Sequence, residues 1–64
     1  MEFRIEFDRE EDGRWIADIP ELPGVLAYGA TQEEAKANAE ALALRVLADR
    51  IEASKKAVPI VTFA

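Results

Sequence analysis

Acidic residues alternate along the stretch DREEDG, in which Asp8, Glu10 and Asp12 precede Gly13. Carboxylates at every second position can converge on one hard cation, and the glycine allows the sharp turn that a calcium loop needs. The twelfth position of such a loop requires a bidentate glutamate, but Ile19 stands there. We therefore interpret the stretch as a solvated acidic turn, and we expect neither a metal nor any other cofactor.

The side chains that carry most enzymatic chemistry are missing, because the 64-residue chain contains no histidine and no cysteine. This composition excludes disulfides, thiolate and imidazole metal sites and histidine-dependent triads. Paired carboxylates could still serve acid–base chemistry, but nothing in the sequence marks a pocket for them. We expect a protein that is not an enzyme.

The charge balance points to a protein partner. Eight Lys and Arg residues are outnumbered by 13 Asp and Glu residues, which gives a formal net charge of −5. Attraction to phosphate backbones depends on Lys and Arg, so we expect no direct binding of nucleic acid and a basic protein as partner. The sequence has neither a signal peptide nor a run of about 20 apolar residues, so we expect a cytoplasmic chain without membrane contact.

The length predicts one domain over residues 1–64. A core in so short a chain contributes only a few kcal/mol of stability. We therefore expect self-association into a homo-oligomer, a dimer or larger.

Period-two patterns predict three strands in the first half of the chain. Apolar and polar residues alternate over 2–8, an Asp-Gly turn follows at 12–13, and 14–19 resume an extended pattern. A third strand is expected over 25–28 and ends at Gly29.

A helix should follow at once. Thr31 and Glu34 form a T-x-x-E capping box, which predicts a helix start at Gln32. The absence of Gly and Pro extends the helix to about Ala53.

At about 100° per residue the helix carries two apolar stripes. The stripe expected to face the sheet holds Ala35, Ala39, Leu42, Ala43 and Val46. The second stripe is too apolar for free solvent and holds Ala37, Leu44, Leu47, Ala48 and Ile51. We expect Leu44, Leu47 and Ile51 to contribute to an oligomer interface.

The element order predicts an α+β fold of β-β-β-α-β type. Residues 58–63 have strand composition, and Pro59 confines them to a sheet edge. The first three strands should form an antiparallel meander, and the helical crossover should return the last strand parallel to the first, in the spatial order 3-2-1-4. The helix then covers one face and leaves the other wet.

The joint between the second and third strands concentrates the conformationally restricted residues Pro20, Pro23 and Gly24. The prolines lower the entropy of the unfolded loop and should hold Glu21 and Leu22 in a fixed, exposed geometry. Such a loop suits partner binding, and a purely structural connection is an equally open interpretation.

Two aromatic residues flank this joint. Stacking on nucleic-acid bases needs a basic groove, which the composition does not supply, so Trp15 and Tyr28 are better read as core or interface anchors. We predict a partner-binding surface of Trp15, Glu21, Leu22 and Tyr28.

Five short motifs follow one another along the chain. They are Asp12-Gly13, the IPELPG run at 19–24, YGAT at 28–31, EEA at 33–35 and Asn38-Ala39. Each motif alone is weak, but the ordered set is specific and resembles the HicB family of antitoxins over nearly the whole chain.

The resemblance implies a partial ribonuclease-H-like fold and a module that binds and neutralises a small basic HicA-like toxin, a protein that cleaves mRNA with a catalytic histidine. This chain has no histidine and the opposite charge, so it is not the toxin. The alternatives are an orphan homo-oligomeric structural or regulatory module and, more distantly, a residual nuclease.

The chain departs from the family pattern in two ways. Val25 stands where a cysteine is common after Pro-Gly, a change that we expect to affect only local packing. No helix-turn-helix or ribbon-helix-helix module follows the last strand, so we expect no operator binding by this chain itself.

Overall fold

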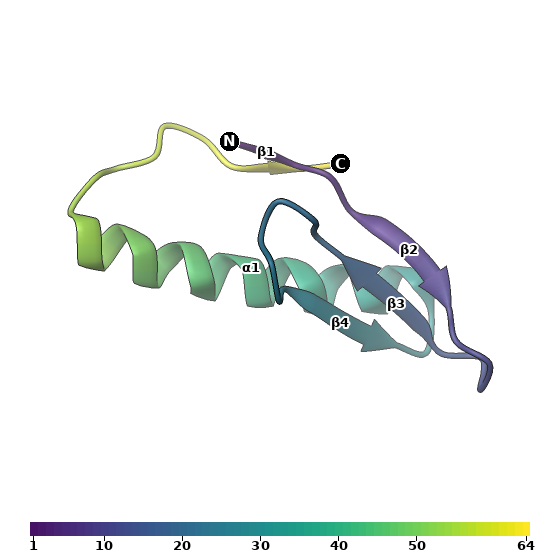
Figure 1. Ribbon diagram of the computed structural model, residues 1–64. Helices are drawn as coiled ribbons and strands as arrows, with labels where there is room; N and C mark the ends of the chain where they lie inside the picture. The colour runs from purple at the N-terminus through teal and green to yellow at the C-terminus, as the bar shows by residue number, and fades with distance from the viewer.

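A computed structural model describes residues 1–64, and Figure 1 shows a helix lying across one face of a small sheet. The elements in chain order are β1 (Glu2–Phe3), β2 (Glu6–Arg9), β3 (Trp15–Asp18), β4 (Leu26–Gly29), α1 (Gln32–Ser54) and β5 (Thr62–Phe63). Strands β2, β3 and β4 form an antiparallel sheet, and β1 pairs with β5 in parallel. The predicted α+β fold of β-β-β-α-β type is confirmed.

The predicted first strand is divided into β1 and β2, because its two halves have different neighbours. The backbone N–H of Arg4 donates to the Glu21 carboxylate at 3.3 Å instead of joining a strand ladder. The next N–H, of Ile5, donates to the Ala64 carbonyl at 2.9 Å. When β1 and β2 are counted as one strand, the predicted order 3-2-1-4 and the parallel last strand are both found.

The last strand is shorter than predicted. Pairing with β1 is confined to Thr62–Phe63, although strand composition begins at residue 58. Pro59 has no N–H to give to a ladder, and its neighbour Ile60 uses its carbonyl to accept a bond from the amino terminus of Met1 at 2.6 Å. Regular pairing therefore starts only after these residues.

Helix α1 spans Gln32–Ser54, close to the predicted bounds. The Thr31 hydroxyl accepts from the Glu34 N–H at 3.1 Å, as a capping box requires. The Glu34 carboxylate reaches one residue further back than expected and accepts from the Ala30 N–H at 3.1 Å. Lys55 ends the helix in the left-handed conformation with φ 59°. No helix combines the length and apolarity needed to cross a membrane.

The core is small and rich in alanine. Its buried members are Phe3, Ala17, Ile19, Leu22, Val25, Ala35, Ala39, Ala43 and Leu47. The three helix alanines confirm the stripe predicted to face the sheet, and the other two residues of that stripe, Leu42 and Val46, are half-buried against the core. Small side chains on α1 allow the helix to approach the sheet closely.

The chain is elongated for its size. Its radius of gyration is 12.5 Å, whereas a compact domain of this length is expected to measure about 11 Å. Figure 1 shows the reason: α1 runs beyond the three-stranded sheet, toward the segment that leads into β5. Only 10 of the 64 residues are buried, so much apolar surface stays in contact with solvent.

Candidate protein-interaction surface

The sheet of β2, β3 and β4 has one face against α1 and one uncovered face. Side chains alternate between the two faces along each strand, and the cross-strand register groups Glu6 with Asp18 and Leu26, and Asp8 with Ile16 and Tyr28. The uncovered face, called the outer face below, consists of Glu6, Asp8, Ile16, Asp18, Leu26 and Tyr28. It combines carboxylates at one side with apolar side chains at the other.

The carboxylates of the outer face have no cationic partner. The two ion pairs of the chain join Arg4 to Glu21 and Arg14 to Asp12, and neither involves a carboxylate of this face. Glu6 lies directly opposite Asp18 in the register, an arrangement of like charges that destabilises a sheet. A cation from another molecule would relieve this repulsion.

The proline joint is packed into the core, which corrects the expected exposure of Leu22. Leu22 is only 1% exposed, and its N–H donates to the Ile19 carbonyl at 2.9 Å. Its carbonyl accepts from the Val25 N–H at 2.9 Å, and Gly24 takes a positive φ of 88°. Two consecutive tight turns thus direct the leucine inward, where a partner cannot reach it, and the two prolines, Pro20 and Pro23, lie within these turns.

Glu21 is exposed but already engaged within the chain. Its Oε2 lies 3.2 Å from Arg4 Nε, and both carboxylate oxygens also accept from the Arg4 N–H. The backbone N–H of Glu21 itself, followed by the side chain and backbone of Arg4, holds the pKa of this carboxyl below its ordinary value. The side chain therefore ties the joint to the break between β1 and β2.

Trp15 and Tyr28 lie on opposite faces of the sheet. Trp15 is half-buried on the helix side, with the Arg9 guanidinium 5.4 Å from its ring centroid. Tyr28 is 40% exposed on the outer face, and the Arg14 guanidinium lies 4.6 Å from its ring centroid. The four residues predicted to bind a partner therefore do not form one surface.

Tyr28 has two apolar neighbours on the outer face that the sequence interpretation missed. Ile16 lies opposite Tyr28 in the register, and Leu26 is 40% exposed on the same face of β4. Strict alternation within each strand was the available signal, because residues two apart share a face.

Two of the motif residues fix the start of α1 against β4. A Cβ on Gly29 would lie 2.8 Å from the Glu34 carbonyl carbon and closer still to the Ala35 nitrogen, so only glycine fits there. The Asn38 side chain donates from Nδ2 to the Tyr28 carbonyl at 2.9 Å. The YGAT and NA motifs thus have a structural explanation in the contact between the strand and the helix.

The acidic turn is ordered by its own residues. Asp12 accepts from the Arg14 N–H at 3.0 Å and from Arg14 Nε at 2.7 Å, and these contacts, the backbone one first, lower the pKa of Asp12. Gly13 has φ 91° and makes the turn possible. Asp8 points elsewhere and accepts from the Arg9 N–H at 2.8 Å. No three carboxylates of the chain gather closely enough to share a metal ion.

The second helix stripe is only partly exposed, and the placement of Leu47 on it is corrected. Leu47 is 3% exposed and belongs to the same core cluster as Phe3. It lies one turn after Ala43 and so continues the ridge of α1 that faces the core. Leu44 is 50% exposed and Ile51 is half-buried, and their role in association stays a prediction.

One open hollow of about 500 Å³ lies on the helix side of β2, lined by Phe7, Gln32, Glu33 and Lys36. Its walls are the first turns of α1 and the edge of the sheet. It is separate from the outer face, because Phe7 alternates with Glu6 and Asp8 along β2.

Comparison with known proteins finds a similarity among curated proteins. No protein-family model matches the chain, and no solved structure matches it. Among curated proteins, the chain is similar to UPF0150 protein Ta0767 of Thermoplasma acidophilum, with 27% identity over 59 residues. The alignment covers 92% of this chain and 84% of that protein.

Proposed function

We propose that this chain is an antitoxin-type interaction module that binds and neutralises a small basic HicA-like RNA-cleaving toxin. The observation that carries the proposal is the outer face, where Glu6, Asp8 and Asp18 lie together and none of them has an ion-pair partner within the chain. The ordered motifs that resemble HicB antitoxins supply the class of partner.

The electrostatic argument follows from what such a toxin must bind. A protein that holds RNA presents Lys and Arg to the phosphates. Carboxylates fixed on a sheet can compete for that surface, accelerate association and select against acidic proteins. The repulsion between Glu6 and Asp18 in the free chain would be relieved on binding, which adds to the affinity.

Specificity needs more than charge. Tyr28 and Leu26 are exposed beside the carboxylates, and Tyr28 is a residue type enriched in binding hot spots. Their backbone lies in β4, so ordering these side chains costs less than ordering a mobile loop. Glu21 and Leu22, which the sequence suggested for this role, are occupied within the chain.

The test is charge reversal on the outer face. The double variant Glu6→Lys with Asp8→Lys should weaken binding to the basic toxin by about 100-fold or more, as expected when several carboxylates of a hot spot are lost. Affinity is measured by calorimetry, and inhibition is measured as protection of RNA from the toxin.

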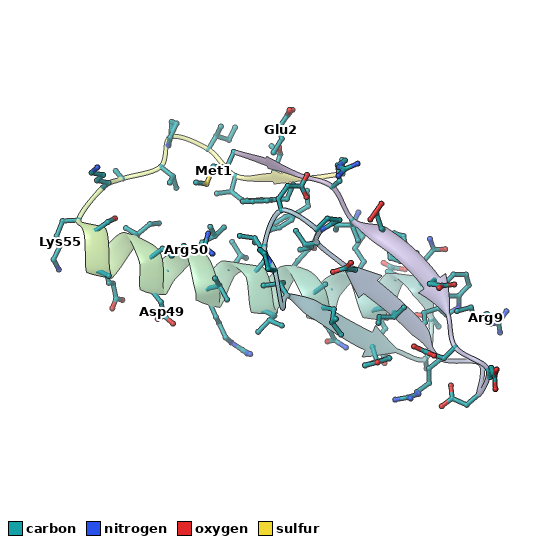
Figure 2. All side chains as sticks on the ribbon, viewed as in Figure 1. Met1, Glu2, Arg9, Asp49, Arg50 and Lys55 are labelled. Atoms are coloured by element: carbon teal, nitrogen blue, oxygen red, sulfur yellow. The ribbon has the colours of Figure 1, made fainter.

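The matched control changes the net charge equally at a distant place. Asp49 and Glu52 are exposed near the end of α1, where Figure 2 shows Asp49 away from β2. The variant Asp49→Lys with Glu52→Lys should lose much less affinity. Equal losses in both variants would remove the outer face from the interface, and failure of the unaltered chain to bind any such toxin would refute the proposed function.

A further inference from the structure

The edge formed by β4 has backbone groups that point away from the sheet and no charged side chain of its own. Hydrogen-bonded pairs alternate along an antiparallel ladder, and the Ile19 N–H donates to the Val25 carbonyl at 3.1 Å. In the register of β3 and β4, the backbone groups of Ala27 therefore form hydrogen bonds with β3. The N–H and C=O groups of Leu26 and Tyr28 point away from the sheet. The strand reads LAYG, without a charged side chain.

The edge formed by β2 is guarded by charge. The Glu10 N–H donates to the Arg14 carbonyl at 2.8 Å, so the same alternation leaves the backbone groups of Phe7 free. Pairing of two copies about Phe7 would place Glu6 opposite Asp8 of the other copy, and like charges directly opposite destabilise a sheet. Charged edges of this kind are a known protection against edge-to-edge pairing.

We propose that β4 pairs antiparallel with β4 of a second copy of this chain, across a two-fold axis at Ala27. The outward backbone groups of Leu26 then exchange hydrogen bonds with those of Tyr28 in the other copy, and the reverse pair does the same. The leucine and tyrosine side chains become cross-strand neighbours, an aliphatic–aromatic contact that stabilises paired strands. The two sheets become one continuous sheet.

Several observations favour a second copy as the occupant. Each copy carries a net charge of −5, which opposes association, but β4 itself has no acidic side chain and the Arg14 guanidinium lies over its Tyr28. The pattern of Leu26, Ala27 and Tyr28 is complementary to itself under a two-fold rotation. The elongated chain buries only 10 of its residues and gains the apolar burial that it lacks alone.

The contact of Asn38 with β4 is compatible with pairing. Asn38 Nδ2 donates to the Tyr28 carbonyl, which is one of the outward groups. A carbonyl oxygen has two lone pairs and can accept a second hydrogen bond from the other copy.

The decisive experiment is charge exchange at β4, followed by sedimentation at about 50 µM protein and by circular dichroism. The unaltered chain should sediment as a dimer. The variant Leu26→Lys with Tyr28→Lys sets lysines opposite lysines and should be a monomer. A second double variant carries Leu26→Glu and Tyr28→Glu. Mixing it in equal amounts with the lysine double variant should restore the dimer, because opposite charges then face each other.

Two further variants keep the proposal testable if a charged strand fails to fold. Ala27 sits on the two-fold axis in a non-hydrogen-bonded pair, with Cα atoms expected about 4.5 Å apart, and the chain has no cysteine of its own. Ala27→Cys should therefore form a disulfide-linked dimer on oxidation. Ala53, which is exposed in the last turn of α1, provides the controls: Ala53→Cys should not cross-link, and Ala53→Lys should leave the dimer intact.

A monomeric unaltered chain would overturn the proposal. So would dissociation by Ala53→Lys, or a dimer in which Ala27→Cys does not cross-link. These measurements need no toxin, so their failure is distinguishable from failure of the proposed function.

Discussion

The two ends of the core are built very differently. Around the proline joint, Ile19, Leu22 and Val25 are each at most 3% exposed and are held by consecutive turns. Where the chain termini meet, two strands of two residues each pair in parallel, and Ile60 is 63% exposed. The joint is therefore rigid and closed, while the terminal region is thin and open to solvent.

This difference teaches that a concentration of Pro and Gly is not in itself a sign of recognition. In this chain the restricted residues direct Leu22 into the core, and the apolar residues that we propose for recognition lie on a regular strand, β4. Regions with few buried contacts open first in native proteins, so the terminal region should be the first part to open.

The largest expected effect on stability comes from truncating the buried side chain of the proline joint. Leu22→Ala removes a fully buried side chain and should lower the free energy of unfolding by about 2–5 kcal/mol. That is most of the stability available to a domain of this size, so the variant should be largely unfolded at 37 °C in circular dichroism. The neighbouring variant Glu21→Ala should stay folded. A Leu22→Ala chain with an unchanged urea midpoint would show that the joint is not part of the core.

A smaller effect is expected at the terminal region. Phe63 stacks on Phe3 with ring centroids 5.9 Å apart, but Phe63 is only half-buried. Phe63→Ala should cost about 1–2 kcal/mol, less than the truncation in the joint.

The effect of this variant should also be local. Hydrogen exchange should accelerate at the Ile5 and Ala64 amides, whose bonds join β5 to the rest of the sheet, and change little in β3. Ile60→Ala, at an exposed position, is the control. Uniform acceleration along the chain would mean that the two regions open as one unit.

The smallest effect concerns pH and the contact that links the two regions. The pKa of Glu21 is lowered from its ordinary value of 4.5, so its contribution to stability is complete above that pH and is lost as the pH falls through the lower folded value. Because the side chain is exposed, the contribution is small and screened by salt. The urea midpoint should decrease between pH 7 and pH 3, and this decrease should be smaller for Glu21→Gln than for the unaltered chain. An equal fall would mean that Arg4 and Glu21 are not coupled in solution.

Local rules predicted much of the fold from the sequence. The capping box placed the helix start at Gln32, and alternation placed the hairpin, because both depend on neighbours within a few residues. The break in the first strand was not predictable in this way. It depends on the Glu21 carboxylate, which takes the Arg4 N–H from 17 residues away.

The errors in the candidate site have a similar origin. Leu47 lies at the border between the two helix stripes, and helix periodicity alone does not decide that it is buried with the core. Leu22 follows an exposed glutamate in a loop, and only the consecutive turns decide that it points inward. The opposite orientations of Trp15 and Tyr28 could have been predicted from their strands, once the register was known.

The pairing of β1 with β5 has a consequence for the order of folding. The bond between the Met1 amino group and the Ile60 carbonyl spans 59 positions, so this contact closes a loop of almost the entire chain. Closing so long a loop costs more conformational entropy than forming the hairpin or the helix, which need only local contacts. These local elements should therefore form first. During synthesis from the N-terminus, β1 must wait without a strand partner until residues 62–64 have been made. The growing chain therefore carries a free strand that the finished fold conceals.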